Sequence, residues 1–68
     1  MTPARLDECL ALIGWTQRGL AKRLGLHETR VRRWANGMYP VPDDVAGWLE
    51  RRAQAMADDP CPTLSNTN

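Results

Sequence analysis

The sequence contains no phenylalanine, one histidine and two cysteines, Cys9 and Cys61. Two cysteines do not make a disulfide framework, and neither has a second ligand at the spacing of a metal site. Cys9 lies in a helical apolar pattern and is expected to be buried, whereas Cys61 is expected to be exposed. No apolar run approaches the roughly 18–20 residues that span a bilayer, and no charged-then-apolar signal precedes the first helix. These absences favour a cytoplasmic protein without a membrane segment.

Catalytic patterns are missing as well. Because His27 is the only histidine, neither a histidine-based metal cluster nor a catalytic triad can be assembled. The acidic pairs at 43–44 and 58–59 are neighbours in the chain, which suits helix caps and tails rather than acid–base catalysis. No glycine-rich phosphate loop follows a strand, since no strand-like alternation is present. We therefore expect no enzyme activity, no metal and no cofactor.

What the sequence does have is an uneven distribution of charge. The net charge of the 68 residues is only +1 at pH 7, which taken alone argues against a nucleic-acid ligand. Residues 1–14 and 40–68 are each net acidic, however, and residues 15–39 are strongly basic, with six cations and the single carboxylate of Glu28. Positive charge confined to one segment is what an electrostatic footprint on phosphate requires.

Apolar spacing and capping residues predict four helices in one small domain, over residues 3–13, 16–24, 28–36 and 43–57. Thr2 is a good N-cap for the first helix, and a glycine follows each of the first three. Asp43 and Asp44 stand at the start of the fourth, where carboxylates cap N–H groups and complement the helix dipole. The predicted fold class is all-α, a compact four-helix domain over residues 1–57. Residues 58–68 are polar and proline-containing, and we predict a flexible tail there.

The apolar positions of these helices predict the core. Trp34 and Trp48 are expected to pack inside rather than to stack on bases, and Trp15 is expected to cover the edge of the core. The other predicted core positions are Leu6, Cys9, Leu10, Leu12, Ile13, Leu20, Ala21, Leu24, Leu26, Val31, Val45, Leu49 and Met56.

Two short helices joined by a tight turn at Gly25 are typical of a helix-turn-helix. Residues 16–26 (TQRGLAKRLGL) and 31–37 (VRRWANG) resemble the lambda-repressor-like family, of the Cro/Xre type, and the resemblance covers about residues 5–55. It implies an all-α domain with a central helix-turn-helix that binds double-stranded DNA and places the helix at 28–36 in the major groove. His27 and Arg30 depart from the family pattern, which usually has Ser and Thr at these positions.

Base contacts are expected from the exposed side of the third helix, at Glu28, Thr29, Arg32 and Arg33. Glu can accept from cytosine N4, Thr can touch the thymine methyl group, and Arg can pair with guanine O6 and N7. For Glu28 the alternative is a local role at the positive end of the helix dipole. Of the two arginines, we expect one to read a base and the other to contact phosphate.

Contacts to the DNA backbone are expected from Gln17, Arg18, His27, Asn36 and Tyr39. The resemblance implies that Gln17 contacts a phosphate and braces the start of the third helix; otherwise it is a solvated polar residue. Tyr39 either donates its hydroxyl to phosphate or packs over Pro40. Lys22 and Arg23 either add charge along the backbone or belong to a solvated face.

These features predict a sequence-specific DNA-binding transcriptional regulator, a small bacterial or phage repressor or an antitoxin-type protein. A homodimer is expected because one short helix contacts too few base pairs for useful specificity, and the helix at 43–57 is the expected dimer surface. The alternative is a protein-interaction module on the same fold, with weak or no DNA binding. Its tail and its acidic C-terminal half would then dock a partner such as a toxin or a polymerase subunit.

Overall fold

The computed structural model describes residues 1–62. These residues form four helices and no strand: α1 (Pro3–Ile13), α2 (Gln17–Leu24), α3 (Glu28–Ala35) and α4 (Asp43–Asp58). The predicted all-α class is confirmed, and every predicted helix end lies within one residue of the observed one. None of the described helices has the length and apolar character needed to cross a membrane. Residues 63–68 of the predicted tail lie outside the described residues.

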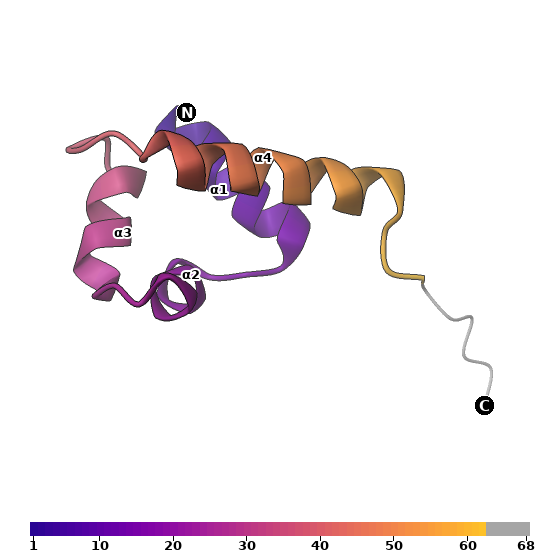
Figure 1. The fold of residues 1–68 in the computed structure, drawn as a ribbon, viewed down its shortest axis with the longest axis horizontal. Coiled ribbons are helices and arrows are strands. Elements are labelled where there is room, and N and C mark those ends of the chain that lie inside the picture. Colours follow the sequence, from indigo (N-terminus) through magenta and orange to yellow (C-terminus); the bar gives the residue numbers. More distant parts are fainter. Residues whose placement is uncertain (63–68) are drawn as a thin grey trace.

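The four helices pack in a simple order. α1 contacts both α4 and α3, and α2 contacts α3. Figure 1 shows α3 beside the first turn of α4, while the last turns of α4 extend away from α2 and α3. The helix-turn-helix of α2 and α3 is therefore held at one end of the molecule by α1 and α4.

Side chains cap the first three helices. The hydroxyls of Thr2 and Thr16 each accept the backbone N–H three residues ahead, at 3.1 and 3.0 Å. At α3, His27 Nδ1 accepts the N–H of Thr29 at 3.1 Å. Each bond satisfies one of the N–H groups that a helix leaves free at its N-terminus. The three caps define where α1, α2 and α3 begin.

α4 begins differently. Pro42 occupies its N-cap position and makes no side-chain hydrogen bond. Asp43 and Asp44 are its first two helical residues, and Asp44 Oδ1 accepts the N–H of Val45 at 2.9 Å. Two carboxylates in the first turn also complement the positive end of the helix dipole.

The turn between α2 and α3 takes only three residues, 25–27. Gly25 has φ 73°, a left-handed conformation that a side chain would strain. The N–H of Leu26 donates to the Ala21 carbonyl at 2.9 Å, and the Leu26 side chain packs against the core. Ala21 is 1% exposed, so its small side chain lies in close contact where the two helices meet. This turn fixes the angle between α2 and α3.

Ten buried residues form the core: Leu6, Cys9, Leu10, Leu20, Ala21, Val31, Trp34, Val41, Leu49 and Ala53. Trp34 is buried as predicted, but Leu12, Leu24 and Trp48 are 42, 37 and 36% exposed, so their predicted burial is wrong. Leu12 is two positions from the buried Leu10, a rotation of about 200° around the helix. Leu24 is the last residue of α2. Trp48 instead stacks on Trp15, with ring centroids 5.5 Å apart.

An ion pair joins α1 to α4. Arg5 Nη2 lies 2.7 Å from Glu50 Oε1, and Arg5 Nε donates to both carboxylate oxygens at 3.0–3.1 Å. The hydrogen bonds from Arg5 lower the pKa of Glu50 below its usual value, and the pKa of Arg5 is raised in turn. This contact holds the two helices in register beside the core.

Candidate nucleic-acid interface

The rotation of α3 is fixed by its two buried residues, Val31 and Trp34, which are 0 and 4% exposed. The rest of the helix surface is therefore free, and it carries Arg30, Arg32, Arg33 and Asn36, all exposed. Glu28 and Thr29 are half-buried in the first turn. The four predicted base-contacting residues thus all lie outside the core on one short helix.

Glu28 and Arg32 form an ion pair along α3. Arg32 Nη2 lies 3.9 Å from Glu28 Oε2, and the side chains of Arg32 and Glu28 are 56 and 39% exposed. A pair this long and this exposed is weak, so either partner can exchange it for a ligand at little cost. Arg33 has no carboxylate partner among residues 1–62; its guanidinium lies 6.0 Å from the ring centroid of Tyr39.

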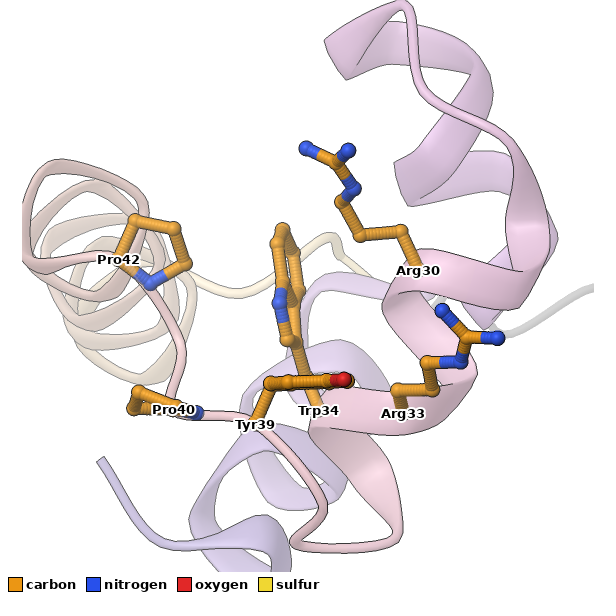
Figure 2. A pocket seen from close by; sticks show the side chains of 6 residues that line it. All are labelled: Arg30, Arg33, Trp34, Tyr39, Pro40 and Pro42. Carbon is orange, nitrogen blue, oxygen red and sulfur yellow. The ribbon is translucent and has the colours of Figure 1, made fainter.

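A basic groove of about 370 Å³ lies toward the C-terminal half of α3, lined by Arg30, Arg33, Trp34, Tyr39, Pro40 and Pro42. Figure 2 shows the two arginines extending from α3 on one side and the two prolines on the other, with Trp34 and Tyr39 between them. Arg30 is not among the predicted contact residues. The signal for it was its spacing from Arg33, because residues three apart share a helix face.

A second basic groove, also of about 370 Å³, lies at the start of α3, lined by Arg18, Ala21, Lys22, Leu26, His27 and Glu28. It brings Lys22 together with Arg18 and His27. Because His27 Nδ1 accepts a hydrogen bond, the proton of its neutral ring is on Nε2. His27 can therefore cap α3 and donate to an anion at the same time.

The other residues predicted to contact the DNA backbone are Gln17, Asn36 and Tyr39. Gln17 is half-buried, and its Nε2 donates to Asp7 Oδ1 of α1 in a long hydrogen bond of 3.4 Å, so its observed partner lies on α1 rather than on α3. Asn36 is exposed at the C-cap of α3, and Tyr39 is 56% exposed beside Pro40. Arg23 lies over the ring of Trp15, 4.1 Å from its centroid, and lines neither of the two grooves.

An exposed cationic helix, held at a fixed angle by a second helix and bordered by two basic grooves, defines a DNA-binding helix-turn-helix. A family model described as helix-turn-helix, of the Cro/C1 type, matches residues 6–46. The chain belongs to this family, as its resemblance to lambda-repressor-like proteins indicated, and it is a DNA-binding helix-turn-helix regulator. No curated protein and no solved structure gives a significant match.

The family has a regulatory rather than a typically enzymatic role. Within residues 1–62, no three His, Cys, Asp or Glu side chains gather in a way that would hold a metal ion. The chemistry that this surface offers is recognition of anions and of base edges.

Proposed function

We propose that the protein is a sequence-specific transcriptional repressor that binds its operator as a homodimer, with α3 of each copy in a major groove. The observation that carries the proposal is the position of α3 between two basic grooves. A helix about 10–12 Å across fits a major groove about 12 Å wide. The two sugar-phosphate strands that border that groove then meet the two sets of cations.

The roles within α3 follow from its contacts. Arg33, which no carboxylate of the described chain holds, pairs with guanine O6 and N7, and Thr29 contacts a thymine methyl group. Glu28 accepts from cytosine N4, while Arg32 leaves its weak pair with Glu28 for a neighbouring phosphate.

The backbone contacts divide between the two grooves. Arg18, Lys22 and His27 contact one phosphate strand near the start of α3, with Gln17 beside them. Arg30, Asn36 and Tyr39 contact the other strand near its end. Phosphate contacts of this kind set the register of the protein on the duplex, and base contacts add the specificity.

Dimerisation is part of the proposal because α3 has only eight residues. A helix of two turns reads few base pairs, and two half-sites about one turn of DNA apart double the contacts. A small repressor that controls its own operon, with or without a toxin as protein partner, fits such a minimal domain. Residues 1–57 form the DNA-binding unit in this view.

Selection of bound duplexes from a random pool tests the proposal. We expect an enriched motif with two-fold symmetry, bound with an affinity that falls steeply with salt, at about −0.9 in log–log slope for each phosphate contacted. Genomic fragments serve as a second pool. Absence of salt-dependent binding to every duplex would overturn the proposal and favour a protein-interaction module on the same fold.

A further inference from the structure

One outward face of α4 carries a distinct set of side chains. With 3.6 residues per turn, six positions between the middle of the helix and the residue just after its end fall within about 60° of Ala55. They lie on the side away from the buried Leu49 and Ala53. The six are Trp48, Arg51, Arg52, Ala55, Asp58 and Asp59, all of them exposed. We refer to this set as the α4 face.

The α4 face borders an apolar groove. The groove has a volume of about 420 Å³ and is lined by Ile13, Trp15, Arg52, Ala55, Met56 and Asp59. The stacked pair of Trp15 and Trp48 adjoins it, and the guanidinium of Arg52 lies 5.6 Å from the ring centroid of Trp48. Tryptophan, methionine and arginine are enriched in the buried centres of protein interfaces.

The charges of the α4 face have no opposite partner within residues 1–62. Arg51, Arg52, Asp58 and Asp59 take part in none of the ion pairs there. Asp58 only accepts a hydrogen bond from Gln54, at 3.0 Å. Two carboxylates at the C-terminal end of a helix also oppose its dipole, which favours cations at that end. A partner that complements the α4 face therefore carries negative charge opposite Arg51 and Arg52 and positive charge opposite Asp58 and Asp59.

We propose that the α4 face pairs with the α4 face of a second copy of this chain, antiparallel and centred on Ala55. The two arginines precede Ala55 by four and three positions, and the two aspartates follow it by three and four. A two-fold axis at Ala55 therefore brings Arg52 to Asp59 of the second copy and Arg51 to Asp58 of the second copy. Both pairs form twice, as a self-complementary two-fold interface requires.

The residue at the centre of the pairing, Ala55, has a small side chain. This leaves the two helices free to approach closely, while the groove beside Ala55 receives apolar side chains of the second copy. The interface then has an apolar middle and charged ends, the usual arrangement of a protein–protein contact.

The pairing also sets the distance between the two copies of α3. Ala55 lies twelve positions after Asp43, or about 18 Å along the helix. The first turns of the two copies of α4 are then about 36 Å apart, and α3 lies beside that first turn (Figure 1). Half-sites on one face of DNA repeat at about 34–36 Å. This consequence rests on the proposed function, whereas the pairing itself rests on α4 alone.

Charge exchange tests the pairing, with sedimentation of the full chain as the measurement and no DNA present. The double variants Arg51→Glu/Arg52→Glu and Asp58→Arg/Asp59→Arg each place like charges opposite one another, and we expect a dimer dissociation constant at least tenfold higher than that of the wild type. An equimolar mixture of the two should form a heterodimer, because every pair is then complementary. The fourfold variant that combines both exchanges should dimerise like the wild type.

Helical content from circular dichroism accompanies each sample. Asp58→Arg/Asp59→Arg places cations where the dipole favours them, so loss of its dimer is not a loss of α4. A monomeric wild type, double variants that dimerise like the wild type, or a folded fourfold variant that stays monomeric would each overturn the pairing. A dimer that binds no duplex would instead contradict the proposed function and leave the pairing intact.

Discussion

His27 Nδ1 accepts the backbone N–H of Thr29 at 3.1 Å, so an imidazole caps α3. The lambda-repressor-like pattern usually has serine at this position, and a serine hydroxyl could make the same bond. The imidazole differs in having a second nitrogen, Nε2, and His27 lines a groove together with Arg18 and Lys22. In our proposal, this one side chain both caps the first turn of α3 and donates to a phosphate.

Two substitutions separate these roles of His27. His27→Ala removes the cap and is expected to lower the free energy of unfolding by about 1 kcal/mol, measured by urea denaturation. His27→Ser retains a cap and should keep nearly wild-type stability, yet bind duplexes more weakly because the Nε2 donor is gone. Wild-type affinity in His27→Ser would argue against the phosphate contact.

Arg33 and Arg18 differ in what they are expected to recognise. Arg33→Ala should cost about 1–3 kcal/mol on the selected operator and relax the preference at one base position. Arg18→Ala should weaken binding to all duplexes alike and reduce the salt slope by about 1. Titrations of the selected duplex and its single-base variants measure both effects. If Arg33→Ala left the base preference unchanged, our assignment of the α3 side chains would be wrong.

Glu28 is the only acidic side chain of α3, and its removal should change the charge of the DNA-binding surface. In Glu28→Gln the 3.9 Å pair with Arg32 is lost, so we expect higher affinity for duplexes of every sequence and a weaker preference for cytosine at one position. Glu8→Gln on α1, where Glu8 pairs with Arg5 at 2.9 Å, is the matched control. If the two substitutions changed the affinity equally, Glu28 would act only through the net charge of the protein and not through a contact with DNA.

The Arg5–Glu50 pair should make the free energy of unfolding depend on pH in the acidic range. The pKa of Glu50 is lowered in the folded chain from its ordinary value of 4.5. The contribution of the ionised Glu50 to the free energy of unfolding is therefore fully present above about pH 4.5. It is lost as the pH falls through the lower pKa that Glu50 has in the folded chain. Thermal unfolding from pH 6 down to pH 2 should show this loss in the wild type. In Glu50→Gln the dependence should be weaker, and an unchanged profile would mean that other carboxylates govern it.

Much of the fold could be predicted because its signals are local. Thr2 and Thr16 cap with oxygens that reach only three residues ahead, and glycine follows each of the first three helices. The exposure of Leu24 and Trp48 depends on which helices cover them, which periodicity within one helix does not contain. The burial of Val41, between two prolines of the connector, likewise depends on how the connector folds against the core.

The helix that forms the candidate site was predictable from the sequence, whereas the grooves beside it were not. Sequence spacing located α3 and its exposed cations, and it could also have paired Arg30 with Arg33. The groove that these two form with Tyr39 and Pro42 depends on how the chain returns from α3 to α4. The contact of Gln17 with Asp7 depends on how α1 lies relative to the start of α2.

The two free thiols of the chain lie in opposite environments. Cys9 is 0% exposed and burial raises its pKa, whereas Cys61 is exposed. A thiol-modifying reagent can thus reach Cys61 at any time but reaches Cys9 only in molecules whose core has opened. The ratio of the two modification rates reports how often the folded chain opens around α1. Measured with and without operator DNA, that ratio would show how strongly binding suppresses these openings.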